Sequence, residues 1–446
     1  MNILLLTQIV PYPPDAGPKI KTWHVLSYLV EHGHQVTLVT FMRKEEEQNV
    51  ESLRKVCNAV FTVPIRRSRQ SDVFYWLRSH ITGRPFLIER DDSNKMKKLV
   101  NQLLLTESID VIHADQLTMA QFALLSRRYN VNAYPLSIPR KENEYLDGAQ
   151  HNLSSIRPTL IFDAHNAVWT IMERMRQNTP GFLKPVIALE AWRVKRYEGR
   201  ITSTFDHTLA VTEVDRLALQ EAAHFDKKGN SVSIPPIKVI PIVVDTELLR
   251  PVKRSSGSCN IMTLGTLHYP PNADGIRWFI REVFPLVRQQ IPDATLTVVG
   301  KNPPHDLLQL ASQAPQSITF TGYVPDLTPY FEQAALMVVP VRSGGGMRVR
   351  ILEGFARAMP VVTTTIGLEG IDARPNQDVW VQDTADGFAQ AVVKLIKDED
   401  RQAELGINGR RLVERKYDWK VALEELGSLY KMIEIERSEI ELDFKI

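Results

Sequence analysis

Residues 334–364 read AALMVVPVRSGGGMRVRILEGFARAMPVVTT. The run from Ala335 to Val341 is apolar and rich in valine, which is typical of a strand buried on both faces. The following glycines, Gly344 to Gly346, allow a tight turn. A helix is expected over 347–358 and a second strand over 360–363. This order of strand, turn, helix and strand predicts a crossover unit of a parallel α/β sheet.

The turn and the helix that follows it also predict a binding site. Backbone amides near Met347 point at whatever lies over the glycines, and the positive end of the helix dipole favours an anion there. Arg348 and Arg350 can bind phosphate oxygens through paired hydrogen bonds, and Glu353 can accept hydrogen bonds from sugar hydroxyls. Phosphate together with hydroxyls indicates a sugar nucleotide. Alternatively, Arg350, Glu353 and Arg357 form ion pairs on a solvated helix face, but such pairs require no glycine turn.

At these residues the chain resembles the GT-B-fold retaining glycosyltransferases of family four, the glycosyl transferases group 1. Members of that family carry a Glu, seven residues and a second Glu around this helix. Glu353 matches the second Glu, which the resemblance implies contacts the ribose, whereas Gly345 stands where the first Glu normally holds the donor sugar. Arg348 and Arg350 lie where relatives often bind the diphosphate.

The resemblance extends over most of the chain. The first forty residues, IFDAHNAVW around His165, GTLHYPPNADG from Gly265 and TFTGYVPDL from Thr319 all have counterparts in the family. Two segments depart from it. Residues 241–245 read PIVVD where many members have Pro-Asn-Gly-Val-Asp, and the Arg that is common shortly after Gly265 is absent.

Further candidate residues follow predicted strands. His165 ends a strand, where ligands of parallel sheets bind, and the resemblance places it near the reacting sugar; alternatively it is a structural loop residue. His113 and Asp115 are weaker candidates for acceptor contacts. The remaining nucleotide-binding candidates have an ordinary alternative as turn, capping or packing residues: Gly17, Gly265, Asn272, Gly322 and Tyr323.

Composition narrows the class of protein. The chain has 446 residues, 43% of them hydrophobic and 24% charged, which is typical of a soluble protein with two domains. A formal net charge of +2 does not favour nucleic acid. Cys57 and Cys259 are isolated, so neither a disulfide framework nor a zinc site is predicted, and a reducing cytoplasm fits. The short apolar run at Ile3–Leu6 predicts a strand and not a signal peptide, and no segment is long enough to span a membrane.

Alternating strands and helices are predicted twice along the chain. The expected fold is α/β of the GT-B type, with two doubly wound Rossmann-like domains facing across a cleft. The first domain is expected at 1–250, on the acceptor side, and the second, which binds the nucleotide sugar, at 258–417. Residues 418–446 are expected to form a crossover helix that packs back on the first domain, and residues 131–157 a long surface loop.

Residues 66–90 combine six arginines with Phe74, Tyr75, Trp76 and Leu77. Such a surface suits a lipid-linked acceptor at the anionic inner face of a membrane. The competing interpretation, somewhat favoured by the shortness of the apolar run, is that Phe74 to Leu77 fill the core.

The sequence therefore predicts a retaining transferase that moves a sugar from a nucleotide-diphosphate donor to a hydroxyl of a sugar, lipid-linked or glycan acceptor. The expected setting is polysaccharide or glycolipid synthesis in the cytoplasm or peripherally at the inner membrane face. Catalysis is expected from His165, Arg348 and Glu353, without a metal or a further cofactor. Two alternatives stay open, namely an inactive nucleotide-sugar-binding regulator, for which Gly345 speaks, and a sugar-nucleotide epimerase. A nicotinamide dehydrogenase is weaker, because no G-x-G-x-x-G follows the first strand.

Overall fold

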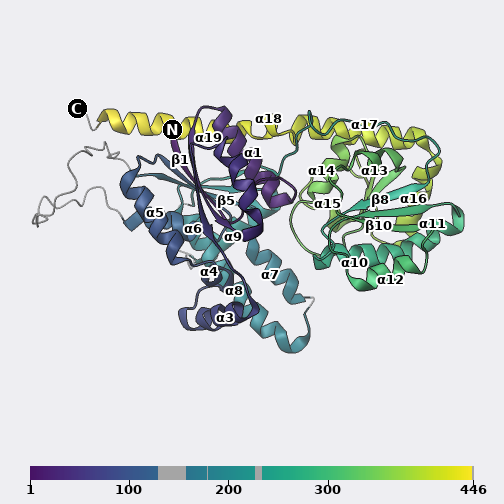
Figure 1. Ribbon diagram of the computed structural model, residues 1–446, viewed down its shortest axis with the longest axis horizontal. Coiled ribbons are helices and arrows are strands. Elements are labelled where there is room, and N and C mark those ends of the chain that lie inside the picture. The colour runs from purple at the N-terminus through teal and green to yellow at the C-terminus, as the bar shows by residue number, and fades with distance from the viewer. Residues whose placement is uncertain (129–156, 178, 227–233, 444–446) are drawn as a thin grey trace, which may run out of the picture. The chain divides into compact units, whose positions relative to one another are not determined.

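A computed structural model describes residues 1–128, 157–177, 179–226 and 234–443 (Figure 1). The predicted loop at 131–157 therefore lies almost wholly outside the described residues. The chain divides into two compact units: unit 1 comprises Met1–Ile240 and Leu423–Ile446, and unit 2 comprises Pro241–Ala422. Sequence analysis had placed this boundary about ten residues later.

Unit 1 is built on a seven-stranded parallel sheet of order β3-β2-β1-β4-β5-β6-β7. The strands are β1 (Asn2–Thr7), β2 (Gln35–Met42), β3 (Ala59–Pro64), β4 (Val111–Asp115), β5 (Thr159–Ala164), β6 (His207–Ala210) and β7 (Ile237–Val239). The central strands β1, β4 and β5 are short runs whose side chains are almost all buried on both faces, for example Leu4, Leu5 and Leu6 of β1.

Helices cover both faces of this sheet (Figure 1). They are α1 (Gly17–Glu31), η1 (Lys44–Asn49), α2 (Val50–Arg54), α3 (Arg69–Thr82), α4 (Phe86–Arg90), α5 (Asn94–Thr106), α6 (Ala120–Ala123), η2 (Leu124–Arg128), α7 (Val168–Gln177), η3 (Gly181–Leu183), α8 (Lys184–Thr204), α9 (Glu213–Asp226) and α19 (Glu424–Asp443). The C-terminal α19 belongs to unit 1, where Arg437 Nη2 donates to Asp110 Oδ1 at 3.0 Å.

Unit 2 contains a six-stranded parallel sheet of order β10-β9-β8-β11-β12-β13. Its strands are β8 (Asn260–Leu264), β9 (Thr295–Val299), β10 (Ile318–Gly322), β11 (Leu336–Val339), β12 (Val361–Thr363) and β13 (Trp380–Val381). Its helices are α10 (Pro270–Trp278), the π-helical turn η4 (Phe279–Val283), α11 (Phe284–Gln290), α12 (His305–Ser312), α13 (Thr328–Gln333), α14 (Val349–Ala356), α15 (Thr365–Leu368), α16 (Ala385–Lys397), α17 (Glu399–Lys416) and α18 (Trp419–Ala422).

The strand order reverses at one point in each sheet. Chain order runs outward in one direction from β1 and in the other from β4, and the same reversal separates β8 from β11. Ligands of doubly wound sheets bind beyond the carboxyl ends of the strands at this switch point. The predicted α/β architecture of two Rossmann-like sheets is confirmed. In each sheet a ligand site is expected at the carboxyl edge, beside the switch point.

The described helices include none with the length and apolar character needed to cross a bilayer. A sequence expectation about α3 is wrong. Phe74, Trp76 and Leu77 do not fill the core, because their exposed fractions are 60%, 43% and 52%.

Candidate functional site

The switch point of unit 2 combines the loop after β11 with the loop after β8. Gly344 and Gly346 adopt left-handed backbone conformations, with φ of 91° and 86°, which a residue with a Cβ rarely adopts. A Cβ at Gly344 would also lie 3.2 Å from Pro271 Cγ of α10. Helix α14 begins at Val349, two residues later than predicted, so Met347 is a buried residue of the loop.

Arg350 connects the two loops. Its Nη1 donates to Leu264 O at 3.0 Å, and its Nη2 donates to the side chain of Asn272 at 2.8 Å. Asn272 in turn donates from Nδ2 to Thr266 O at 3.0 Å. The backbone of Gly265 approaches so closely that a Cβ there would lie 2.7 Å from Arg350 Nη1. The structure thus brings three predicted residues together, namely Gly265, Asn272 and Arg350.

The charge of Arg350 is poorly solvated. Burial, reinforced by the nearby guanidinium of Arg348 and opposed by Glu353, lowers the pKa of Arg350 to about 10. Its Nε is buried and has no hydrogen-bond partner among the residues that the structure describes. Two like charges at the same edge of the sheet favour the binding of an anion there.

The side chain of Arg348 folds back onto the backbone of the glycine loop. Its side chain is 9% exposed, and Nη1 donates to the carbonyl oxygens of Gly345 and Gly346. The guanidinium therefore stabilises the loop conformation, in addition to placing positive charge beside it.

Glu353 lies on α14 within the same cluster of charges. Burial raises the pKa of Glu353, while Arg357 and Arg350 act to lower it. A half-buried carboxylate that is near two guanidinium groups can accept hydrogen bonds from hydroxyl groups of a ligand.

The edge strand β10 and the residue after it supply two further predicted residues, Gly322 and Tyr323. Gly322 has φ of 72°, and its carbonyl accepts from the N–H of Gly300 at 3.0 Å. Tyr323 is 61% exposed, so it does not fill the core, and Lys301 Nζ lies 4.1 Å from the centre of its ring. Sequence analysis missed Lys301, because a single lysine after a strand carries no recognisable signal.

At the switch point of unit 1, His165 and Asp115 form a buried pair. His165 Nε2 donates to Asp115 Oδ1 at 2.7 Å, and Thr22 Oγ1 of α1 donates to the other oxygen at 3.1 Å. His165 Nδ1 is buried and lacks a hydrogen-bond partner within the described part of the chain. Because the carboxylate fixes the proton on Nε2, Nδ1 of the neutral ring is available to accept a proton or a hydrogen bond.

A second buried pair lies beside it. Lys21 Nζ donates to Asp163 Oδ1, and His113 Nε2 donates to Asp163 Oδ2 at 3.3 Å. Burial alone would raise the pKa of Asp163, but Lys21 and His113 hold that pKa well below its usual range. Tyr430 of α19 donates to His113 Nδ1 at 2.8 Å, which ties the C-terminal helix to the network. Lys21 and Tyr430 were not predicted, because neither a helical lysine nor a contact 317 residues apart is visible in sequence.

Asp115, Asp163 and His165 offer three ligand atoms within 4.8 Å of one another, the geometry of a possible metal site. However, both carboxylates already accept hydrogen bonds, and the ammonium of Lys21 provides a positive charge at Asp163. These residues fit an internally neutralised network better than a site for a divalent cation.

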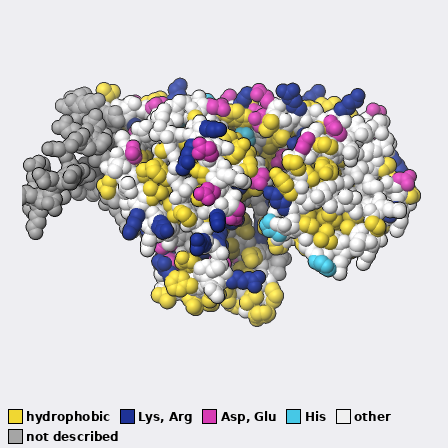
Figure 2. Space-filling view, viewed as in Figure 1, with side chains coloured by type: hydrophobic (Ala, Val, Ile, Leu, Met, Phe, Trp, Pro, Cys, Tyr) yellow, Lys and Arg dark blue, Asp and Glu magenta, His cyan; other side chains and the backbone are white. Residues whose placement is uncertain are grey.

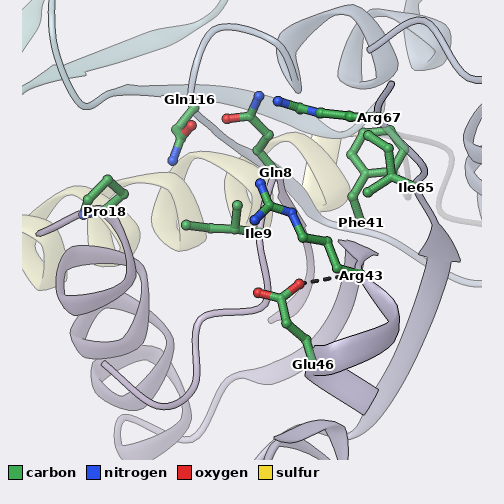
Figure 3. A pocket seen from close by; sticks show the side chains of 9 residues that line it. All are labelled: Gln8, Ile9, Pro18, Phe41, Arg43, Glu46, Ile65, Arg67 and Gln116. Atoms are coloured by element: carbon green, nitrogen blue, oxygen red, sulfur yellow. Dashed lines mark hydrogen bonds between the residues drawn. The ribbon is translucent and has the colours of Figure 1, made fainter. Parts of the chain in front are cut away.

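A pocket of about 240 Å³ opens nearby at the carboxyl ends of β1, β2 and β3 (Figure 3). It is lined by Gln8, Ile9, Pro18, Phe41, Arg43, Glu46, Ile65, Arg67 and Gln116. The buried carboxylate of Asp91 fixes part of this lining, since it accepts from Gln8 Nε2 at 2.6 Å and from Arg67 Nη2 at 2.9 Å. Gly17, predicted to approach a diphosphate, is the first residue of α1, next to Pro18 of this pocket.

Comparison with known proteins agrees with this architecture. Residues 258–398 match the family model described as glycosyl transferases group 1. The chain is 22% identical to an uncharacterised 44.6 kDa protein in the cps region of Klebsiella pneumoniae, over 94% of this chain and 97% of that protein.

Two further proteins are similar over much of their length. A GDP-mannose-dependent monoacylated alpha-(1-6)-phosphatidylinositol monomannoside mannosyltransferase from Corynebacterium glutamicum is 23% identical, over 59% of this chain and 67% of that enzyme. The structure of Anabaena HepE in complex with UDP and glucose superimposes with a TM-score of 0.65 at 13% identity, over 97% of this chain and 100% of that one.

The two parallel sheets and the structural similarity define the class of fold, which is GT-B, and the residues that match the group 1 family model lie in its second unit. The matched residues include the edge of unit 2 described above, from Gly265 to Glu353.

Proposed function

We propose that the protein is a glycosyltransferase. It transfers a sugar from a nucleotide-diphosphate donor to a hydroxyl of a sugar, lipid-linked or glycan acceptor, with retention of configuration and without a metal ion. The match to the group 1 family model supports a transferase, and the relatives named above support a role in polysaccharide or glycolipid synthesis. We propose that the protein acts in the cytoplasm or peripherally at the inner face of the membrane.

The donor proposal rests mainly on the charge at the switch point of unit 2. Arg348 and Arg350 lie close enough for each to disfavour the charge of the other, at an edge where glycines allow a ligand to approach the backbone. A diphosphate bound there relieves this repulsion and stabilises both guanidinium groups. The binding of UDP by HepE at the same fold supports a nucleotide as the ligand.

In the proposed reaction the bond between the anomeric carbon and the diphosphate oxygen breaks, the acceptor oxygen bonds to the same face of that carbon, and the proton of the acceptor hydroxyl passes to the leaving diphosphate. Positive charge from Arg348 and Arg350 stabilises the negative charge that develops on the leaving diphosphate, and this preorganised electrostatic contribution replaces a metal ion. Glu353 accepts hydrogen bonds from the ribose, with Gly265, Asn272, Gly322 and Tyr323 around the nucleotide.

His165 is proposed to act on the donor sugar or on its transition state. Its Nδ1 is the nitrogen that can accept, because Asp115 orients the ring through Nε2. Unit 1 is proposed to select the acceptor. The Glu that resembling enzymes use to hold the donor sugar is replaced by Gly345, so the hydroxyls of the donor sugar are bound by other groups.

Gly345 also favours a second candidate, a protein that binds nucleotide sugars without turning them over. A third candidate is an epimerase of sugar nucleotides, which needs no acceptor. Neither candidate releases nucleoside diphosphate in response to an acceptor, whereas a transferase does.

The decisive experiment is incubation of the purified protein with a panel of UDP-, GDP-, ADP- and dTDP-sugars, with and without membrane extract as the source of acceptor. A transferase releases nucleoside diphosphate at least about tenfold faster with acceptor than without it. Binding without release identifies the inactive protein, and conversion of the donor sugar into its epimer without added acceptor identifies the epimerase.

A further inference from the structure

Helix α3 exposes its apolar side chains, which a helix of a globular protein normally buries. Ser79 is the buried residue among its fourteen described positions, while five large apolar side chains are exposed. They are Val73, Phe74, Trp76, Leu77 and Ile81, and the exposed fraction of Ile81 reaches 87%. Val73, Leu77 and Ile81 recur every four residues and so form a single stripe.

A second group of exposed apolar residues extends from the end of α7 to the first turns of α8. It consists of Met175, Phe182, Leu183, Val186, Leu189 and Trp192, and the exposed fraction of Phe182 is 80%. Residues 180–189 are exposed or half-buried throughout.

The two groups lie on the same part of unit 1. Glu190 of α8 accepts from the N–H of Phe86, just after α3, at 2.6 Å, and His80 of α3 is near enough to lower the pKa of Glu190, which burial raises. Figure 1 places α3 beside the start of α8, and Figure 2 shows hydrophobic side chains gathered there, with Lys and Arg side chains at their border. Together the eleven side chains form the α3–α8 patch, which is far more than the scattered apolar residues of an ordinary surface.

Basic residues surround the α3–α8 patch, and acidic residues are few. Arg66, Arg69, Lys184 and Arg196 are exposed, and the Arg196 guanidinium lies 5.7 Å from the ring centre of Trp192. Helix α3 contains one acidic residue, Asp72, and residues 179–189 contain none. Apolar and aromatic side chains ringed by Lys and Arg match the boundary between lipid headgroups and acyl chains of an anionic bilayer.

We propose that the α3–α8 patch docks unit 1 peripherally onto an anionic membrane. Phe74, Leu77 and Phe182 enter the headgroup layer, and the flanking arginines and lysine bind lipid phosphates. A second copy of the chain is a poorer occupant, because a symmetric dimer through this patch places the same basic rim against itself. The proposal concerns binding to lipid, so it stands or falls independently of the transferase reaction.

The test is co-sedimentation of the full chain with vesicles of phosphatidylcholine alone or with about 30 mol% phosphatidylglycerol. We compare the wild type with the triple variant Phe74→Ser, Leu77→Ser, Phe182→Ser. The matched control is Leu105→Ser, Leu248→Ser, Leu308→Ser, whose side chains are 50%, 78% and 44% exposed outside the patch.

The wild type and the control are expected to bind anionic vesicles at least about tenfold more tightly than neutral ones, and the patch variant to lose at least about tenfold in affinity. The variant Arg66→Gln, Arg69→Gln, Lys184→Gln is expected to lose the preference for anionic lipid. Equal sedimentation of wild type and patch variant overturns the proposal. A wild-type dimer that the patch variant converts to a monomer, without vesicle binding by either, also overturns it in favour of a self-association surface.

A different observation, the pocket of unit 1, carries a second inference about the acceptor, and this one rests on the proposed function. Arg43 and Arg67 both line the pocket, and their side chains point toward Gln8 (Figure 3). Burial lowers the pKa of Arg67, and the like charges of Arg90 and Arg43 add to this effect, whereas Asp91 opposes it. Two of the polar side chains that line the pocket, Gln8 and Arg67, are held in place before any ligand binds, because both donate to Asp91. Glu46, the carboxylate of the lining, accepts from the backbone N–H of Arg43.

We infer that this pocket binds a phosphate group of the acceptor. The test uses inorganic pyrophosphate and calorimetry on the Arg350→Gln background, in which the proposed donor site is disabled. Binding there that decreases at least about tenfold on adding Arg43→Gln and Arg67→Gln, but not Arg54→Gln, supports the inference. Absence of pyrophosphate binding on the Arg350→Gln background overturns it without affecting the donor proposal, which the wild-type protein tests separately.

Discussion

The carboxyl edges of the two sheets share one topology but differ in how their charges are arranged. In unit 1 the polar groups at the switch point are paired within the protein, since the ammonium of Lys21 bonds to Asp163 and His165 Nε2 donates a hydrogen bond to Asp115. In unit 2 two guanidinium groups lie beside a loop of glycines, and their main hydrogen-bond acceptors are backbone carbonyls.

This difference indicates that the two units bind different parts of the substrates. The carboxylates of unit 1 already have hydrogen-bond donors within the protein, which leaves little affinity for a further anion, and the bond to Asp115 favours one tautomer of His165. An edge with surplus positive charge and small residues attracts a diphosphate. Nucleotide binding is therefore expected to depend on unit 2, and sugar transfer on both units.

The largest effect is expected from breaking the ion pair of unit 1. Asp163→Asn leaves the 1% exposed ammonium of Lys21 without its counter-ion, which costs about 3–5 kcal/mol of unfolding free energy. The double variant with Lys21→Met is expected to lose much less than the sum of the single losses, as measured by urea unfolding. Glu51→Gln, which removes the exposed pair with Arg54, serves as control and changes stability by less than about 1 kcal/mol. Strict additivity of the two buried substitutions contradicts the pairing.

In unit 2, Arg350→Gln removes the charge that connects the two loops. We expect nucleoside diphosphate affinity to fall by about 30- to 1,000-fold, because a buried charged donor to phosphate contributes about 2–4 kcal/mol. Titration calorimetry measures this loss, with the exposed Arg281→Gln as control. If the Arg350→Gln variant binds nucleoside diphosphate within twofold of the wild-type affinity, the diphosphate does not bind at Arg350.

His165→Gln is expected to separate chemistry from donor binding. The turnover rate falls by about 100-fold, the usual contribution of a proton-transfer or hydrogen-bonding side chain, while donor affinity stays within about twofold. Asp115→Asn disturbs the same tautomer and is expected to act in the same direction, whereas His224→Gln on the exposed surface leaves the rate unchanged. Loss of donor affinity in His165→Gln, at unchanged rate, is the contrary result.

A smaller effect is expected from Gly265→Ala. The added Cβ lies 2.7 Å from Arg350 Nη1, so the guanidinium has to shift. Nucleotide affinity is expected to decrease about tenfold, which corresponds to about 1.4 kcal/mol. Gly181→Ala is the matched control because nothing lies within 4 Å of the added atom. Unchanged affinity in Gly265→Ala shows that this backbone approach is not part of the site.

Much of the fold was predictable because its strands are short, buried apolar runs. The apolar run from Ala335 to Val341 predicted β11 (Leu336–Val339), and the strand expected over 360–363 is β12 (Val361–Thr363). Helix α3 was missed for a physical reason: its apolar residues face outward, so the usual inference from apolar residues to a core led to the wrong expectation for Phe74, Trp76 and Leu77.

The site was predictable only in part. The glycines, Arg350 and Asn272 could be predicted to share one edge of the sheet because each follows the end of a predicted strand. The hydrogen bond from Arg350 to Asn272 could not be predicted, because it joins residues 78 positions apart. Lys21 and Tyr430 form buried hydrogen bonds to distant strands, and Asp91 bonds to Gln8, which is 83 residues away, so no local pattern marks these residues.

The central claim is that unit 2 binds the nucleotide of a sugar donor. It is tested most directly by thermal unfolding of the wild type and of Glu353→Gln with UDP, GDP, ADP, CMP and dTDP, and the exposed Glu332→Gln is the control. We predict that one nucleotide at about one hundred times its dissociation constant stabilises the wild type and the control by about 2.7 kcal/mol, and the Glu353→Gln variant by clearly less. No stabilisation by any of the five, or equal stabilisation in Glu353→Gln, contradicts the assignment.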